Sequence, residues 1–310
     1  MDKSVLVVVM FSAMAWLTTP ALAAPFSFST GNPDGRLGAL SQPAGGGSLE
    51  TETADDFLLG DTTVIEGATI EGLITSGASL SDITNVEVEV YHVFPTDSVN
   101  VASGNVPTRK NSPSDVEIGS ATRDQSRGTL SFAATLVNSN LSVPSSVVNQ
   151  IKKFPNQATH GDGPAGGAEV QIVMTFTPPI ILPANQYFFR PQVSVDNGQF
   201  LYLSAPKPIV APGTPFPNDL QAWIRNSELA PDWLRIGTDI IAGTTPPVYN
   251  MVFSLNGETF PQAGVPGKPN CHGRTVSALA HQFGGIDAAA ATLGFSSVQQ
   301  LQDTFEVFCN

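Results

Sequence analysis

The chain has 310 residues, of which 41% are hydrophobic and 13% are charged, against a usual charged fraction of about 25%. Its 27 acidic and 14 basic side chains give a formal net charge of -13. Because nucleic acids and anionic membrane surfaces are bound by clustered Lys and Arg, this charge balance excludes them as partners. An acidic chain suits cations, neutral glycans or basic surfaces.

The N-terminus has the pattern of a secretory signal peptide, residues 1–23. Lys3 precedes an apolar run, Val5 to Leu17, and the small residues of "ALA" follow. We expect cleavage between Ala23 and Ala24. The alternative is an uncleaved membrane anchor, but the run is shorter than the ~20 residues that span a bilayer. No later run is apolar enough to span, so we expect no transmembrane segment in the mature chain. The protein is then secreted, periplasmic or at the cell surface.

Residues 24–49 are rich in Gly, Ser and Pro, which predicts a flexible leader. From there on apolar and polar residues alternate, most clearly in "NVEVEVYHVF" (85–94), where Val and Glu take opposite faces of a strand. Asn197-Gly198 lies between two such runs and predicts a hairpin. About ten to twelve strands and no helix are expected over 50–258. That pattern predicts a mainly β fold, an antiparallel, jelly-roll-like β-sandwich.

The C-terminal end differs from the rest of the chain. A linker, residues 259–270, leads to a segment of helical periodicity, 271–310, whose first helix ends at Gly284-Gly285. Cys271 and Cys309, the only two cysteines, bracket this segment. In an oxidising compartment they are expected to pair, which adds roughly 4 kcal/mol of stability in the chain-entropy model. We therefore predict a small disulfide-closed α-helical module.

Two stretches resemble known bacterial sequences. "ETETADDFLL" (50–59), followed by "GATIEGL" (67–73) and "VEVEVY" (86–91), resembles the opening of a loosely defined set of bacterial secreted β-sandwich domains with an "ADDF" motif. The segment around "PNCHG", "LGFSSV" and the final "FC" resembles a C-terminal segment of uncharacterised bacterial secreted proteins, over about 264–310. The resemblances imply a bacterial source, export and a β-sandwich. They carry no known activity and no catalytic residue.

Asp55 and Asp56 lie at the start of the first predicted strand. Adjacent strand residues point to opposite faces, so the two cannot line one general acid–base site. Either one of them joins loop oxygens to bind calcium, or both cap a turn by accepting bonds from backbone N–H groups. Calcium is the only cofactor candidate that the sequence suggests.

Two further pairs have the residue types of catalytic or metal sites. Glu87 and Glu89 lie on one strand face, roughly 7 Å apart by strand geometry, and glycosidases use carboxylate pairs at such distances. The alternative is a solvated strand face. His160 and Asp162 lie in a Gly-rich stretch that either binds a metal or forms a flexible surface loop. We identify no catalytic signature in the chain.

"AWIRN" and "DWLRI" each contain Trp-x-Arg, namely Trp223 with Arg225 and Trp233 with Arg235. If the two segments form a hairpin, the symmetric register places each Trp opposite the Arg of the other strand, ~5 Å away. The four side chains then form a crossed cation–π ladder. The functional interpretation is a flat aromatic platform for sugar rings. The alternative is a stabilised surface, or a face buried under a neighbouring loop or the helical module.

These observations favour an exported, non-enzymatic binding or surface module that recognises a glycan, a matrix component or an extracellular protein. One alternative is a secreted carbohydrate-active enzyme, which would need an inward cleft with two carboxylates. Another is a structural or sorting protein in which the helical module serves attachment.

Overall fold

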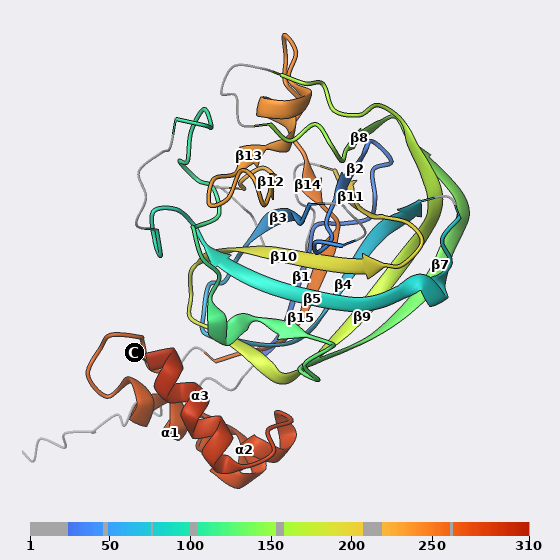
Figure 1. Cartoon of the computed structure of the whole chain (residues 1–310). Coiled ribbons are helices and arrows are strands. Elements are labelled where there is room, and N and C mark those ends of the chain that lie inside the picture. The colour runs from blue at the N-terminus through green and yellow to red at the C-terminus, as the bar shows by residue number, and fades with distance from the viewer. Residues whose placement is uncertain are drawn as a thin grey trace, which may run out of the picture.

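A computed structural model describes residues 24–45, 49–75, 77–98, 104–152, 158–206, 219–260 and 263–309. Two β-sheets pack face to face, and three helices, drawn in red in Figure 1, lie together at one end of the sandwich. The predicted fold class, a mainly β antiparallel sandwich with a helical C-terminal module, is confirmed. No helix in the described ranges is long and apolar enough to cross a membrane.

The larger sheet has nine strands among the described residues. They are β1 (Ala24–Ser29), β2 (Leu37–Leu40), β4 (Thr63–Thr75), β7 (Leu130–Val143), β8 (Ser145–Val147), β9 (Ala165–Leu182), β11 (Phe200–Ala205), β14 (Asn250–Met251) and β15 (Phe253–Thr259). The order is β1-β15-β4-β11-β2-β8, with β14 beside β11 and with β9 between β4 and β7. The β2–β8 pair is parallel, and the other described pairs of this sheet are antiparallel.

The smaller sheet has six strands in the order β13-β12-β3-β10-β5-β6. They are β3 (Thr51–Leu58), β5 (Ile83–His92), β6 (Arg123–Asp124), β10 (Gln186–Val195), β12 (Trp223–Asn226) and β13 (Leu234–Arg235). Short helical turns lie at η1 (Leu80–Asp82), η2 (Gly119–Ala121) and η3 (Ile236–Ile241), the last of them π-helical.

The core lies between the inner faces of the two sheets. Val86, Val88 and Val90 of β5 are fully buried there, as the alternation predicts. Aromatic side chains fill the centre, and the rings of Phe189 and Phe253, one from each sheet, stack with centroids 5.0 Å apart. Burial of such rings, 150–250 Å² each, is the main stabilising contribution in a core of this kind.

The expected flexible leader over 24–49 is wrong for most of its length. β1 pairs with β15 along all six of its residues, and β2 lies inside the larger sheet between β11 and β8. Phe28 and Leu37 are buried in the core. The Gly and Pro residues of this stretch therefore mark turns between short strands, and composition alone did not distinguish turns from a lack of packing.

Two other predictions concern the hairpin at Asn197-Gly198 and the signal-peptide cleavage site. Asn197-Gly198 does form a turn, but it joins β10 to β11, which belong to different sheets, so the predicted hairpin is wrong. The predicted signal peptide, with Ala23 at its end, lies outside the described residues, and β1 begins at Ala24.

The helical module consists of α1 (Cys271–Phe283), α2 (Ile286–Thr292) and α3 (Val298–Cys309). The predicted disulfide between Cys271 and Cys309 is present. Gly284 ends α1 with a φ of 73°, a left-handed conformation that glycine adopts without strain. The module has its own small core, which continues onto the sandwich. Its members include Val64, Ile181 and Phe260 from the sandwich and Leu279, Leu301 and Phe305 from the helices.

Candidate functional site

The β12–β13 hairpin brings the two Trp-x-Arg segments together. Trp223 pairs with Arg235 across the strands, which confirms the predicted register. The guanidinium of Arg235 lies 6.0 Å from the ring centroid of Trp223, and that of Arg225 lies 4.3 Å from the ring of Trp233. The crossed cation–π ladder predicted from the sequence is therefore present.

The predicted flat platform for sugar rings is wrong, because this face is buried. Trp223 is 1% exposed and Trp233 is 0% exposed. Residues 109–115, here named the cover segment, contact the outer face of the smaller sheet beside β12 and β13. The indole N–H of Trp233 donates to the carbonyl of Ser114 at 3.3 Å, and Arg225 donates to the carbonyl of Asp115 at 3.4 Å. Burial under a neighbouring loop, the alternative interpretation, is the correct one.

Arg109 fixes the cover segment to the sheet. It is 2% exposed and forms ion pairs with Asp115 and, at 3.1 Å, with Asp232. Its guanidinium also lies 4.5 Å from the ring centroid of Phe94. A buried guanidinium held by two carboxylates is costly to separate from them. The cover segment is consequently a fixed part of the fold.

An ionic network lies on the same outer face of the smaller sheet. Arg190 and Arg225 both pair with Glu52, and Arg190 also pairs with Glu89. The Tyr91 hydroxyl lies 3.1 Å from Glu52 and 2.5 Å from Glu89. Burial alone would raise the pKa of Glu52, but the two neighbouring guanidinium groups outweigh it and lower that pKa below its usual value. Glu52 is therefore an ionised, fully paired carboxylate inside the protein.

Glu87 and Glu89 do not form a solvated strand face, which was the alternative to a catalytic carboxylate pair. Their side chains are 27% and 13% exposed, and Glu87 lies 3.6 Å from Arg190. Burial, together with a hydrogen bond to Glu89, raises the pKa of Glu87 to about 7, although Arg190 opposes this shift. Near neutral pH the Glu87 carboxyl group is therefore partly protonated. Neither of the two surface pockets described below is lined by Glu87 or Glu89.

Asp55 and Asp56 are both fully buried and bind to protein donors. Asp55 accepts a bond from the N–H of Met251 at 2.7 Å, while Asp56 accepts bonds from the side chain of Gln186 at 2.6 Å and from the N–H of Leu220 at 2.9 Å. Burial, and then the charge of Asp56, raises the pKa of Asp55 well above its usual value. Within the described ranges no three His, Cys, Asp or Glu residues are grouped to hold a metal. Calcium at Asp55 and Asp56 stays a prediction.

His160 and Asp162 also contact the protein. Asp162 accepts bonds from three successive backbone N–H groups, of Val148, Asn149 and Gln150, at 2.8, 3.1 and 3.4 Å. His160 Nδ1 lies 3.0 Å from the carbonyl of Ile241. These bonds anchor the Gly-rich stretch to the stretch after β8 and to η3.

A surface pocket of about 250 Å³ opens beside the hairpin, and we name it the Trp223 pocket. Its lining comes from the cover segment, from the stretch before β12, from the hairpin and from the stretch before β14. The lining residues are Lys110, Asn111, Asp219, Leu220, Gln221, Trp223, Arg235 and Val248. The indole N–H of Trp223 is buried and has no hydrogen-bond partner among the described residues. An unpaired buried donor is costly, so a ligand acceptor at this position would be favourable.

Contacts outside the Trp223 pocket orient its polar groups. Arg235 donates two bonds to Asp239, at 3.0 and 2.6 Å. Gln221 accepts a bond from the Thr238 hydroxyl at 2.9 Å. The pocket thus combines fixed donors, fixed acceptors and both signs of charge, with the buried Trp223 in its wall. Such a lining suits a small polar ligand of about the size of one sugar unit.

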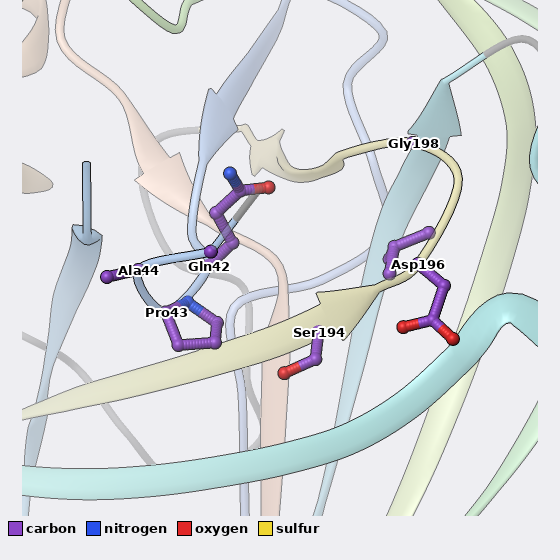
Figure 2. A pocket seen from close by; sticks show the side chains of 8 residues that line it. Gln42, Pro43, Ala44, Ser194, Asp196 and Gly198 are labelled. Carbon is purple, nitrogen blue, oxygen red and sulfur yellow. The ribbon is translucent and has the colours of Figure 1, made fainter. Parts of the chain in front are cut away.

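A second pocket, of about 310 Å³, lies where the turn after β10 meets the loop after β2 (Figure 2). Its lining residues are Gln42, Pro43, Ala44, Gly45, Ser194, Val195, Asp196 and Gly198. Figure 2 shows Pro43 and Ala44 on one wall and Ser194 and Asp196 on the other. Asp196 is the one ionisable residue of this lining, and its carboxylate accepts a bond from the Thr84 hydroxyl at 3.2 Å. The lining has no aromatic ring, so we favour the Trp223 pocket as the site.

Sequence reasoning identified two of the eight residues that line the Trp223 pocket, Trp223 and Arg235. The other six lining residues follow no pattern in the sequence. Comparison with family models, with curated proteins and with solved structures gave no match for the chain. The site is therefore argued from its geometry alone.

Proposed function

We propose that the protein is an exported, non-enzymatic binding module that holds one sugar unit of an extracellular glycan in the Trp223 pocket. The observation that carries the proposal is the Trp223 pocket itself, a hollow of about 250 Å³ whose lining offers polar groups and both signs of charge, among them Lys110, Arg235 and Asp219. Sugars present hydroxyl groups that accept and donate hydrogen bonds, and a pocket with fixed polar groups complements them.

Export is supported by two independent features. The N-terminal pattern predicts a signal peptide, and the disulfide between Cys271 and Cys309 is typical of oxidising compartments. The low charged fraction, 13%, fits a hydroxyl-rich extracellular surface.

The geometry favours binding over glycoside hydrolysis. The carboxyl pair of Glu87 and Glu89 is tied to Arg190 and Tyr91 and does not line the Trp223 pocket. An acid and a base must reach the scissile bond from one cleft. The enzyme alternative therefore has no support at this site.

Glycan-array binding of the purified protein, with and without calcium, followed by titration of the best ligand, tests the proposal. Trp223→Phe keeps an aromatic ring and removes the N–H, and Lys110→Ala removes an exposed cation at the rim. We expect each change to weaken binding about tenfold, the effect of about 1.4 kcal/mol. The matched control is Lys152→Ala, which changes an exposed cation that does not line this pocket.

Retained affinity in both pocket variants, or no binding to any glycan under either condition, would overturn the proposal. A requirement for calcium would instead place the sugar contact at a metal site and not in the Trp223 pocket as proposed.

A further inference from the structure

Strand β7 forms an open edge of the larger sheet. It is 14 residues long, and among the described strands it pairs with β9 alone. Figure 1 shows β7 at the rim of the sandwich, on the side away from the helical module. An edge strand presents unpaired backbone N–H and C=O groups that can pair with another strand.

The alternation of hydrogen bonds along the β7–β9 pair shows which backbone groups of β7 are unpaired. The N–H of Thr177 donates to the carbonyl of Thr129 at 2.9 Å, at the start of the β7–β9 ladder. Bonded pairs alternate along an antiparallel ladder, so the backbone groups of Phe132, Ala134 and Leu136 point away from β9. No hydrogen bond within the described chain uses these outward groups.

The chemistry of β7 leaves this edge unprotected. Residues 130–143, "LSFAATLVNSNLSV", contain no charged residue, no Pro and no Gly, although such residues block most natural edges. Leu136 and Val137 are 52% and 54% exposed. The one protective feature is a pair of register shifts after Leu136, which leaves a regular stretch over 130–136.

We propose that a second copy of this chain pairs with this edge, β7 against β7, in an antiparallel arrangement about a two-fold axis at Ala134. Phe132 of one copy then lies opposite Leu136 of the other, and Ala134 lies opposite its counterpart. The three pairs of outward groups would form about six backbone hydrogen bonds between the copies. This interaction is additional to the proposed glycan binding.

Self-complementarity is the reason for choosing a second copy as the partner, since the net charge by itself opposes association of two copies. Each chain carries a formal charge of -13, so two copies repel one another wherever carboxylates meet. The edge of β7 has no charge to oppose the contact, and the residues that flank it on the outer face, Ser131, Ala133 and Thr135, are small and neutral. An isologous contact needs one self-complementary surface, which an antiparallel strand edge supplies.

The expected dimer is weak. Seven residues of strand span about 23 Å, and a sheet is about 10 Å thick, so each copy buries much less than the roughly 800 Å² per partner of a standard interface. Association should therefore depend on concentration and strengthen with salt, because salt screens the repulsion between the acidic chains. A dimer would also present two Trp223 pockets, which raises the avidity for a multivalent glycan.

Sedimentation equilibrium of the purified protein, from about 1 μM to about 1 mM, tests the proposal. We expect a rising dimer fraction for the unmodified chain. Thr135→Lys places like charges close together at the axis and should weaken the dimer at least about tenfold. Val173→Lys is the matched control, because Val173 is 45% exposed on the neighbouring strand β9, one strand away from the edge.

If Thr135→Lys fails to fold, a second variant and a measurement on the unmodified chain still test the proposal. Ala134→Pro removes an outward N–H that the monomer does not use, and it should abolish the dimer. In the unmodified chain, hydrogen exchange at Phe132, Ala134 and Leu136 should slow as concentration rises. A chain that stays monomeric to about 1 mM, or equal weakening by Thr135→Lys and Val173→Lys, would overturn the proposal.

Discussion

The outer faces of the two sheets differ in an instructive way. On the smaller sheet, the charged side chains of Glu52 and Arg190 are 5% and 2% exposed. On the larger sheet, the apolar side chain of Val173 is 45% exposed. Both faces carry the residues that alternate with the core-facing ones. The alternation of apolar and polar residues therefore identifies which residues face away from the core, but it does not show whether that outer face is exposed to solvent.

The cover segment accounts for the difference. It lies over the smaller sheet, and no described element of comparable length is bonded across the outer face of β9 in the larger one. Under the cover, charges persist only because each is paired, as Glu52 is with Arg190 and Arg225. The predictions below test this contrast between a covered and an open face.

Removing the central cation of the covered face should have the largest effect. Arg190→Met leaves Glu52 and Glu89 without the guanidinium that they share, and loss of one partner from a buried ionic network costs about 3–5 kcal/mol. Urea unfolding measures the change in the free energy of unfolding. Arg127→Met is the control, because that side chain is 77% exposed and its pair with Asp124 should contribute under about 1 kcal/mol. A loss of less than about 1 kcal/mol for Arg190→Met would show that the network is not buried.

Detaching the cover segment should have the next largest effect. Arg109→Met removes the guanidinium shared by Asp115 and Asp232, and we expect a loss of about 2 kcal/mol. Because Trp233 then becomes accessible, its fluorescence emission should shift to longer wavelength before global unfolding. Unchanged emission in a destabilised variant would mean that Arg109 stabilises the fold without holding the segment over the sheet.

Glu87 should make the stability of the covered face depend on pH. Its pKa is about 7 in the folded protein and 4.5 for an unperturbed Glu, which represents the unfolded chain. Between these two pH values the folded chain therefore binds more protons than the unfolded chain. The stabilisation is thus complete below about pH 4.5 and is lost as the pH rises through 7. Gln stays neutral, so the stability of the natural chain relative to Glu87→Gln should fall from pH 5 to pH 8. Urea midpoints that run parallel across this range would contradict the assignment.

The smallest effect is expected on the open face. Val173→Thr replaces an exposed methyl group with a hydroxyl, and the free energy of unfolding should change by less than about 0.5 kcal/mol. A cost above about 1 kcal/mol in the same urea assay would indicate that something covers this face as well.

Local and strand-level features could be predicted from the sequence. The pairing of Trp223 with Arg235 follows from the symmetric placement of the two Trp-x-Arg segments, and the Cys271–Cys309 bond follows from cysteine number and predicted compartment. The inward face of β5 follows from its alternation, and the end of α1 follows from Gly284. Each of these depends on residues within one element or on two short matching segments.

Features that depend on distant, irregular contacts could not be predicted. The cover segment has no periodicity, and its position depends on pairs such as Arg109 with Asp232 that the sequence does not link. The Trp223 pocket is assembled from stretches more than 100 residues apart, including Lys110 and Val248. The turn at Asn197-Gly198 has the local chemistry of a hairpin, but the packing of the following strand places it in the other sheet.

The two tryptophans give the most direct test of the covered face. Of the three in the chain, Trp16 lies in the predicted signal peptide, so the chain from Ala24 onward contains only Trp223 and Trp233. Acrylamide quenching of tryptophan fluorescence in a protein of residues 24–310 measures how far solvent reaches both rings. We predict short-wavelength emission and weak quenching, with a large increase after unfolding in urea. Quenching of the native protein close to that of the unfolded chain would contradict the account, because it would place the Trp-x-Arg ladder on an open surface.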